Sequence, residues 1–396
     1  MDPARDKKDM THPHAASDSS ARPSAPELSP ASAPERSPAL AHSLSRPELA
    51  DLVEQLGEKK FRAGQIWRWQ YKDLATRWDD MTNLPAALRE KLRATLLDLD
   101  SAARVEEIAG RSKYETFKLL LRLSDGEIVE TVVIPSKDRH TVCVSCQVGC
   151  AFKCAFCASG ANGATRSLEA GEIAAQAVLA AREIGARPDN IVFMGMGEPF
   201  ANYDAAVKAA RIMNDPEGLG IGARKITIST CGHVPGIARF ADEPEQFELS
   251  VSLHAPTQQL REKLMPVAAT RWDIAELIES CRAYTAKTNR IITFEYTLVD
   301  GVNSSPEHAA ALASLLRGLK CRANLIPLNP TPRYPGKPPD RRDSEAFAAR
   351  LERAGINTTL RRSAGGDLDA ACGQLRASRA QQSRAQNFKA PGEKDD

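Results

Sequence analysis

Residues 143–157 read Cys-Val-Ser-Cys-Gln-Val-Gly-Cys-Ala-Phe-Lys-Cys-Ala-Phe-Cys and contain five of the nine cysteines of the chain. The last three, Cys150, Cys154 and Cys157, have the spacing C-x3-C-x2-C, so one short loop can direct three thiolates at one centre. Cysteine thiolates are the usual ligands of iron-sulfur clusters, and three of them on a four-iron cluster leave one iron open. The spacing therefore predicts a 4Fe-4S cluster with an open iron, which indicates catalysis.

A structural zinc ion is the alternative for this stretch. Structural zinc takes four closed ligands, commonly from two C-x2-4-C pairs. Cys143 and Cys146 could form one pair, and Cys154 and Cys157 the other. Metal analysis distinguishes the two sites, because an anaerobically purified cluster protein is brown with iron and sulfide, whereas a zinc protein is colourless.

The residues around the loop resemble one family. The C-x3-C-x2-C loop is similar to that of radical S-adenosylmethionine (SAM) enzymes, and Cys-Val-Ser-x-Gln-Val-Gly-Cys at 143–150 resembles the RlmN/Cfr RNA methyltransferases. A distant segment, Asp-Leu-Asp-Ala-Ala-Cys-Gly-Gln-Leu at 367–375, is similar to the C-terminal signature of the same family. The resemblance spans roughly residues 48–376.

Length and charge limit the organisation. The 396 residues suffice for a large core with an accessory domain, so we expect two folded domains. The 53 Lys and Arg residues nearly balance the 51 Asp and Glu residues, so any basic surface for nucleic acid must be local.

Both ends of the chain are predicted to be disordered. Residues 1–47 are rich in Ala, Ser and Pro and have few large apolar side chains with which to offset the entropy of ordering. They lack the apolar core of a signal peptide, and no run of about 18 apolar residues indicates a membrane span. Residues 377–396 form a polar tail. We therefore expect a protein of the reducing cytoplasm.

Residues 48–102 have the apolar spacing of a small helical domain. Basic and aromatic side chains alternate in it, a mixture that suits phosphates and stacked bases. The alternative is that each tryptophan belongs to the core, which we favour for any single one, while the resemblance implies an RNA-binding accessory role. The side chains are Lys59, Lys60, Phe61, Arg62, Trp67, Arg68, Trp69, Tyr71, Lys72, Arg77 and Trp78.

Residues 103–140 are predicted to form a β-hairpin linker. Two apolar strands, 115–123 and 128–135, flank an Asp-Gly turn, which is a strong hairpin signal. Glu130 on the second strand would ordinarily be a solvent-facing carboxylate. It lies thirteen residues before Cys143, where the family resemblance implies a glutamate that accepts a proton.

From residue 141 to 376, apolar strands alternate with helical stretches. This order predicts a parallel sheet, and about six such units match the partial (β/α)6 barrel of radical SAM enzymes. In parallel α/β folds, ligands bind at the carboxyl ends of the strands. The predicted strands are 190–195, 225–229, 248–253, 290–298, 323–327 and 357–361.

Polar residues follow four of these strands. The turn Gly-Met-Gly-Glu-Pro at 195–199 would alone be structural more often than not, although its glycines let the backbone approach a ligand. It resembles the family motif that binds the SAM amino group. Hydroxyl, imidazole and amide groups at neighbouring strand ends suit ribose and carboxylate recognition. The expected SAM contacts are Gly197, Glu198, Ser229, Ser252, Leu253, His254 and Asn329.

The remaining cysteines carry less information. Cys231, Cys281 and Cys321 have no metal-like spacing and are predicted to pack as small apolar residues. Cys146 is expected only to neighbour the cluster loop. Cys372, in contrast, lies between small residues that would leave its thiol reachable on a mobile segment, as a nucleophile requires.

The resemblance implies a reaction in two stages that consumes two SAM molecules. Cys372 attacks the methyl group of one SAM as a thiolate and becomes S-methylcysteine, after which a second SAM binds the open iron and is reductively cleaved. The 5'-deoxyadenosyl radical takes hydrogen from that methyl group, and the resulting radical adds to adenine C2. Glu130 removes the C2 proton, and Cys143 releases the product by forming a disulfide with Cys372.

The implied substrate is an adenosine in the peptidyl-transferase region of 23S rRNA, with tRNA as a further substrate. The base must leave its stack, which costs roughly a few kcal/mol. We favour C2 over the C8 methylation of the relative Cfr, because the C-terminal signature and the long helical domain look more like RlmN. A zinc-stapled, non-catalytic RNA-binding protein is the alternative of another class. The expected state is a monomer served by a low-potential electron donor such as flavodoxin or ferredoxin.

Overall fold

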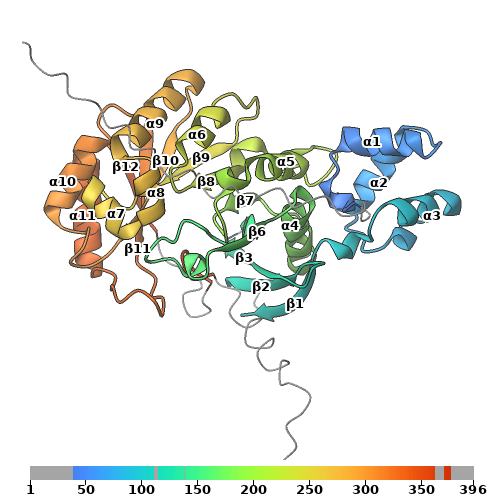
Figure 1. Cartoon of the computed structure of the whole chain (residues 1–396), viewed down its shortest axis with the longest axis horizontal. Helices are drawn as coiled ribbons and strands as arrows, with labels where there is room; N and C mark the ends of the chain where they lie inside the picture. The colour runs from blue at the N-terminus through green and yellow to red at the C-terminus, as the bar shows by residue number, and fades with distance from the viewer. Residues whose placement is uncertain (1–38, 111–114, 138, 362–369, 376–396) are drawn as a thin grey trace, which may run out of the picture. The chain divides into compact units, whose positions relative to one another are not determined.

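A ten-stranded sheet forms the centre of the molecule (Figure 1). This computed structural model describes residues 39–110, 115–137, 139–361 and 370–375. The strand order is β1-β2-β3-β4-β7-β8-β9-β10-β11-β12. The strands are β1 Arg104–Ala109, β2 Phe117–Arg122, β3 Ile128–Ser136, β4 Arg139–Cys143, β7 Asn190–Phe193, β8 Ile226–Thr230, β9 Glu248–Ser252, β10 Ile292–Leu298, β11 Cys321–Pro327 and β12 Asn357–Leu360.

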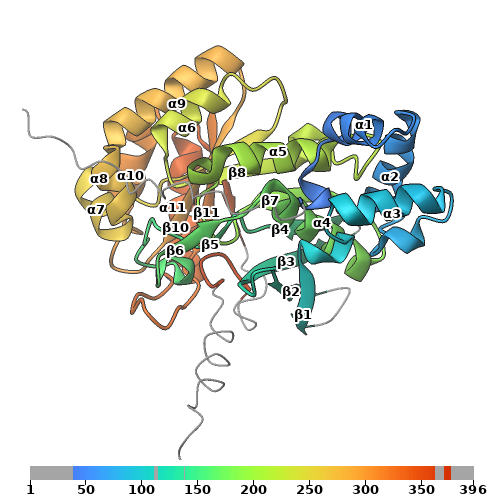
Figure 2. The same cartoon turned by 45° about the vertical axis from the view of Figure 1, so that its right-hand side comes forward.

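Seven neighbouring strands, β4 and β7 to β12, run parallel. Their connections contain helices on the outer side of the sheet (Figure 2), and the sheet stays open because β1 and β12 do not pair in the described chain. The predicted partial (β/α)6 barrel is confirmed. The principal helices are α4 Ala170–Ile184, α5 Tyr203–Asn214, α6 Val234–Phe240, α9 Ile274–Thr288, α10 Pro306–Leu315 and α11 Arg341–Arg353.

The predicted hairpin is present, but it is part of the main sheet and not a separate linker. Its strands β2 and β3 pair antiparallel, and Gly126 at the turn has a φ of 85°, which favours glycine. β3 then pairs antiparallel with β4, where Val132 faces Cys143. Strands β1 and β4 were not expected from the sequence. β4 joins the hairpin to the parallel strands, so the hairpin residues reach the barrel, whereas β1 forms the outer edge of the sheet beside β2.

The helical region packs against the barrel helices α4 and α5. Arg46 forms an ion pair with Asp215 at 2.9 Å, and the Arg182 guanidinium donates to the Leu74 carbonyl oxygen at 3.0 Å. Leu40 is buried, so the folded part begins before the predicted boundary at residue 47. The region contains α1 Arg46–Gln55, α2 Phe61–Tyr71 and α3 Ala86–Thr95.

The tryptophans of this region divide between core and surface. Trp67 and Trp78 are completely buried, and Tyr71 is nearly so, which leaves these rings no face for a stacked base. Trp69 is partly buried and donates to the Asn83 side chain at 2.7 Å. Phe61 is 57% exposed, with the Arg62 guanidinium 4.9 Å from its ring centre. Phe61 is therefore the aromatic side chain of this set best placed for stacking.

A two-stranded sheet carries the cysteine loop, and two short helices lie beside it. The backbone N–H of Ala155 in the loop donates to the Leu264 carbonyl oxygen at 2.9 Å. This bond ties the loop to the segment that follows β9. The elements are β5 Gln147–Gly149, β6 Ala164–Ser167, α7 Gln258–Leu264 and α8 Pro266–Arg271.

Two predicted disordered segments lie outside the described residues, namely 1–38 of the N-terminal extension and the tail at 377–396. Within the described ranges, every helix is too short or too polar to cross a membrane.

Candidate active site

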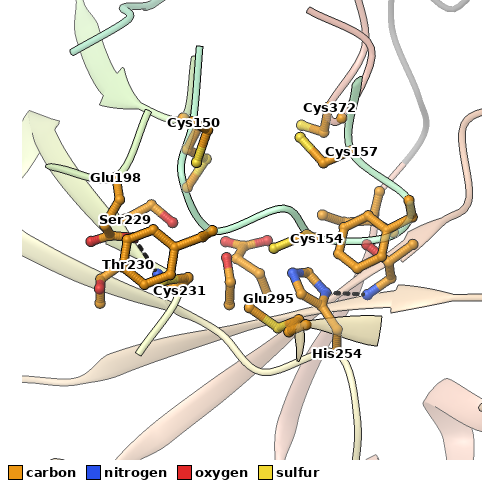
Figure 3. A pocket seen from close by; sticks show the side chains of 18 of the residues that line it. Cys150, Cys154, Cys157, Glu198, Ser229, Thr230, Cys231, His254, Glu295 and Cys372 are labelled. Atoms are coloured by element: carbon orange, nitrogen blue, oxygen red, sulfur yellow. Dashed lines mark hydrogen bonds between the residues drawn. The ribbon is translucent and has the colours of Figure 1, made fainter. Parts of the chain in front are cut away.

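Three cysteines of the loop between β5 and β6 line a cavity at the carboxyl ends of the parallel strands (Figure 3). Cys150, Cys154 and Cys157 all reach it, with the rings of Phe152 and Phe156 among them. The sequence spacing thus places three sulfur atoms around one space, in an apolar surrounding that restricts solvent.

The loop depends on glycines at two close contacts. A Cβ on Gly149 would lie 2.0 Å from the Gly163 carbonyl oxygen, and one on Gly160 would lie 2.8 Å from the Cα of Lys153. Real Cβ atoms do not approach other atoms so closely, so larger residues would displace the backbone. These glycines set the path of the chain that carries the three thiols.

The three thiols are arranged for a charged inorganic partner. Burial raises the pKa of Cys150 to about 12 and raises that of Cys154 well above its ordinary value. Burial also raises the pKa of Cys157. Thiolates in such a place need a compensating positive charge, which a metal centre supplies. Their soft sulfur donors and apolar surroundings fit an iron-sulfur cluster.

The zinc alternative receives no support from the geometry. Among the residues that the structure describes, no three His, Cys, Asp or Glu side chains converge closely enough to hold a single metal ion. Cys146, one of the four thiols of that alternative, is buried away from the cavity, with its backbone N–H bonded to the Met196 carbonyl oxygen at 2.8 Å.

The loop after β7 holds a carboxylate at the cavity wall. Gly197 has a φ of 105°, and a Cβ there would lie 2.8 Å from the Gln147 nitrogen. The Glu198 carboxylate accepts hydrogen bonds from the backbone N–H groups of Phe200 at 3.0 Å and Cys231 at 2.7 Å. Burial raises the pKa of Glu198, and these donors oppose that effect. The carboxylate is therefore fixed in orientation beside the cavity and suits a ligand ammonium group.

His254 has a defined tautomer. Its Nδ1 accepts the backbone N–H of Thr297 at 2.9 Å, so the ring proton is on Nε2. Burial lowers the pKa of His254 to about 3, with a smaller contribution from Arg261, and the imidazole is neutral. Its ring meets the edge of Phe156 with 4.8 Å between the ring centres. His254 thus offers a neutral donor at the cavity wall.

Of the other predicted SAM contacts, all but Leu253 line the cavity. Ser229 and Ser252 line the cavity, as does Asn329, whose amide donates to the Cys372 carbonyl oxygen at 3.0 Å. Leu253 is completely buried outside the cavity lining, and its backbone N–H bonds to the Glu295 carbonyl oxygen. Any contact of Leu253 with a ligand would need its backbone.

Some cavity residues were missed from the sequence. Glu295 lines the cavity with its carboxylate held by the Ser250 hydroxyl at 2.9 Å and the Asn324 amide at 2.6 Å. The sequence feature that could have indicated Glu295 is a single acidic residue within an apolar strand. Cys231, expected to be a packing residue, is buried but lines the cavity as well. No spacing rule indicates it, because its position comes from the end of a different strand.

Cys143 and Cys372 line a second, narrow cavity next to the first. Met194, Ile326 and Asn329, together with Cys372, line both cavities, so the two spaces adjoin. Burial is the main reason that the pKa of Cys143 rises to about 12, and the nearby Cys372 contributes. Cys143 and Cys372, which are far apart in the sequence, therefore lie at the same narrow cavity.

The described part of the C-terminal segment is held in place, in contrast to the expected mobile segment. The Gly373 carbonyl oxygen accepts the Ala158 N–H at 2.7 Å, and the Leu375 carbonyl oxygen accepts the Ser159 hydroxyl at 2.7 Å. The Cys372 side chain lies close to Cys157 at the cavity (Figure 3). The segment is thus bound to the cysteine loop itself.

Glu130 is buried on β3 and does not line either cavity. Its carboxylate lies 3.3 Å from the Lys118 ammonium group, and both side chains are nearly inaccessible. Residues two apart on a strand share a face, so Glu130 lies on the same face as Val132, which lines the second cavity. The expected solvent-facing alternative for Glu130 is therefore wrong.

Comparisons with known proteins cover most of the chain. A model of the Radical SAM superfamily matches residues 144–313, and a model of the ribosomal RNA large subunit methyltransferase N-terminal domain matches residues 42–97. A probable dual-specificity RNA methyltransferase RlmN of Geobacillus kaustophilus (strain HTA426) is 47% identical over 339 residues, which are 85% of this chain and 92% of the relative. This chain belongs to the RlmN family of radical SAM RNA methyltransferases.

Two further comparisons support the RlmN assignment. A probable dual-specificity RNA methyltransferase RlmN of Symbiobacterium thermophilum is 47% identical over 84% of this chain and 90% of that protein. The crystal structure of a radical SAM methyltransferase from Sphaerobacter thermophilus is 48% identical, covers 86% of this chain and 100% of that chain, and superposes with a TM-score of 0.82. Membership of the superfamily implies a 4Fe-4S cluster and SAM for this RlmN-family enzyme.

Proposed function

We propose that this enzyme methylates C2 of an adenosine in the peptidyl-transferase region of 23S rRNA, and of an adenosine in tRNA, with Cys372 as the methyl carrier. The observation that carries the proposal is the position of Cys372. Cys372 lines both the cavity that the cysteine loop borders and the narrow cavity that contains Cys143. One sulfur atom can therefore serve a SAM molecule on one side and a second thiol on the other.

Cys150, Cys154 and Cys157 would hold the 4Fe-4S cluster and leave one iron open for SAM. When bound there, the cluster and SAM supply the 5'-deoxyadenosyl radical. Glu198 would bind the SAM ammonium group, because its buried carboxylate already faces the cavity with two fixed backbone donors. The hydroxyl groups of Ser229 and Ser252, the neutral His254 and the Asn329 amide would orient the remainder.

The chain's own groups then act in a fixed order. The Cys372 thiolate takes a methyl group from the first SAM, which leaves as S-adenosylhomocysteine, and a hydrogen atom of that methyl is later removed. After the carbon has bonded to adenine C2, the adduct must lose one electron, which the cluster would accept, and a base must accept the C2 proton; we assign the role of base to Glu130. The Cys143 thiolate then attacks the Cys372 sulfur, and the S–S bond forms as the bond between that sulfur and the methyl-derived carbon breaks. The carbon takes up a proton and becomes the methyl group of the released base.

Glu130 has support from its surroundings. It lies on the face of β3 that borders the narrow cavity, next to the Lys118 ammonium group at 3.3 Å. The Lys118 ammonium group contacts one carboxylate oxygen of Glu130 and so orients the side chain on this face. The residue is buried, so its proton exchange with bulk water is restricted.

RNA binding would use the helical region of residues 39–102 together with the opening of the cavity. Phe61 and Arg62 offer an exposed ring and a cation on this region. The electron would come from a low-potential donor such as flavodoxin or ferredoxin, and the enzyme would act as a monomer in the cytoplasm, where thiols remain reduced.

Mass spectrometry of nucleosides tests the proposal. Ribosomal RNA and tRNA are compared from cells that lack the protein, cells that express it and cells that express Cys372→Ala. We expect 2-methyladenosine in both RNA classes with the intact enzyme alone. A product methylated at C8 would replace the proposed position, and 2-methyladenosine made by Cys372→Ala would refute the methyl carrier.

A further inference from the structure

Arg261 is a completely buried arginine behind the cysteine loop. It lies on α7, and its guanidinium donates to two backbone carbonyl oxygens, that of Cys231 at 2.8 Å and that of Trp272 at 3.0 Å. Its Nε atom is buried and has no hydrogen-bond partner. In the part of the chain that the structure describes, no carboxylate forms an ion pair with it.

Such a residue is unusual in physical terms. A buried charge is costly unless a charge of the opposite sign compensates it, and carbonyl dipoles compensate it only in part. Burial lowers the pKa of Arg261, yet a guanidinium remains charged in proteins. The guanidinium donates to the carbonyl oxygen of Cys231, and Cys231 lines the same cavity as Cys150, Cys154 and Cys157. A negatively charged group held in that cavity can therefore compensate the buried guanidinium.

The backbone around Arg261 holds its guanidinium in place. Gly232, which follows β8, has a φ of 96°, which favours glycine, and a Cβ there would lie 2.8 Å from a terminal guanidinium nitrogen of Arg261. The helix that carries Arg261 ends at Leu264, whose carbonyl oxygen accepts the N–H of Ala155 in the cysteine loop. The helix is thus tied to the cysteine loop at Ala155, while the guanidinium packs on residues 231–232.

Glu198 and Arg261 form hydrogen bonds with the two backbone polar groups of Cys231. Glu198 accepts the N–H of Cys231, and Arg261 donates to the carbonyl oxygen of Cys231. The two charges are separated by this residue and do not form an ion pair. Glu198 therefore does not neutralise the guanidinium through an ion pair. The positive charge of Arg261 can act on the cysteine sulfur atoms at the cavity.

We propose that the buried positive charge of Arg261 raises the reduction potential of the cluster. One electron from an external reductant adds one negative charge to the cluster, and no proton needs to follow. A fixed positive charge stabilises that added charge, because net charge and buried surroundings set cluster potentials. The inference rests on the proposed ligands Cys150, Cys154 and Cys157.

The variants Arg261→Gln and Arg261→Lys separate charge from structure. Glutamine can still donate to a carbonyl oxygen but carries no charge, whereas lysine keeps the charge and loses the planar pair of donors. Arg271→Gln is the matched control, because Arg271 lies on the adjacent helix α8 with its guanidinium 5.5 Å from the Phe152 ring centre, but is only half-buried.

The measurement is the ratio of reduced to oxidised cluster at one fixed solution potential, determined by electron paramagnetic resonance on anaerobic full-length protein. Iron and sulfide are quantified in each sample. We expect the ratio for Arg261→Gln to be at least about tenfold lower than for the native enzyme, which corresponds to about 59 mV for one electron. Arg261→Lys and Arg271→Gln should stay within about threefold.

The results separate the inference from the function on which it rests. Native protein that binds no iron would refute the proposed ligands, whatever Arg261 does. With iron bound, an unchanged ratio in Arg261→Gln, or an equal fall in Arg261→Lys, would overturn the role of the charge. If Arg261→Gln holds no cluster, Arg261→Lys decides: full iron with the native ratio supports the inference, and a tenfold fall refutes it.

Discussion

Cys150, Cys154 and Cys157 reach the active site from one loop, whereas Cys143 at the end of β4 and Cys372 in the segment 370–375 come together there although they are far apart in the sequence. The first group is organised by local contacts, in which Gly149 and Gly160 fix the path of the backbone. The second group exists only after the sheet has formed and the C-terminal segment has bound to it. The local group is suited to holding a cofactor, and the distant pair to a thiol exchange that the complete fold controls.

The largest expected effect is loss of the local group. Cys150→Ala, Cys154→Ala or Cys157→Ala should each lose the cluster and abolish SAM cleavage, because removing supporting groups alone costs about 10-fold to 100-fold at metal sites. Cys146→Ser is the matched control and should retain iron and cleavage, since Cys146 does not line the cavity. Iron, sulfide and 5'-deoxyadenosine are measured. Equal iron loss in Cys146→Ser would contradict the assignment of ligands.

The distant pair should fail at a later step. Cys372→Ala should prevent methylation of the protein, and Cys143→Ala should keep the methyl carrier but accumulate enzyme linked to RNA. Each should lower RNA turnover by about 10³-fold or more, as removal of a nucleophile does. Intact-protein mass spectrometry after nuclease treatment detects the adduct, and Cys281→Ala is the control. Free Cys143→Ala enzyme with full turnover would remove Cys143 from the mechanism.

Glu130 belongs to neither thiol group. Its substitution tests whether the β2–β3 hairpin contributes a catalytic residue. Glu130→Gln should slow product release by about 10²-fold to 10⁴-fold while SAM cleavage continues, because the C2 proton would have no acceptor. Lys118→Met should show a smaller effect of the same kind, since it removes the charge beside the carboxylate. Single-turnover assays measure adduct formation and release separately. Slower adduct formation with normal release would indicate a structural role for both residues.

Asn329 lies where the two thiol groups adjoin, so its substitution shows which group it serves. Its amide donates to the Cys372 carbonyl oxygen, and losing one such bond costs about 1 kcal/mol, or about fivefold in rate. Asn329→Ala should slow methyl transfer to Cys372 by about that factor and, because Asn329 is also a proposed SAM contact, raise the KM for SAM. A raised KM with an unchanged rate of methyl transfer would argue against a functional role of its bond to Cys372. Thr331→Ala is a nearby control.

The smallest effect is expected far from both groups. Phe61→Ala should weaken RNA binding by about tenfold, because stacking on an exposed aromatic ring contributes about 1–3 kcal/mol per base. SAM cleavage without RNA should be unaffected. Filter binding measures the affinity, and Ile291→Ala, which removes another exposed apolar side chain, is the control. Equal effects of the two substitutions would argue against stacking at Phe61.

Six of the seven parallel strands, β7 to β12, could be predicted because each is a short apolar run between helical stretches. β1 could not, since Arg104, Glu106 and Glu107 give it the polar appearance of a loop, and its pairing with β2 determines its conformation. Likewise, the spacing of residues 150–157 shows that they act together, because the contacts are local. Sequence spacing carries no such information about Cys143 and Cys372.

Single residues in the site were missed for a related reason. Arg261 lies in the helical segment Gln-Gln-Leu-Arg-Glu-Lys-Leu, where a basic residue would ordinarily face solvent. Only the arrangement of Cys231 and Trp272 around it shows that it is enclosed. Glu295 is similar, since its partners Ser250 and Asn324 come from the two neighbouring strands. Such partners are defined by the sheet and not by nearby sequence.

The hydrogen bond between Ala158 and Gly373 also bears on the order in which the site is assembled. The cysteine loop precedes residues 370–375 in the chain, so during synthesis the loop emerges first and this segment can cover it only afterwards. We therefore expect iron and sulfide to reach the three thiols most readily before the segment binds.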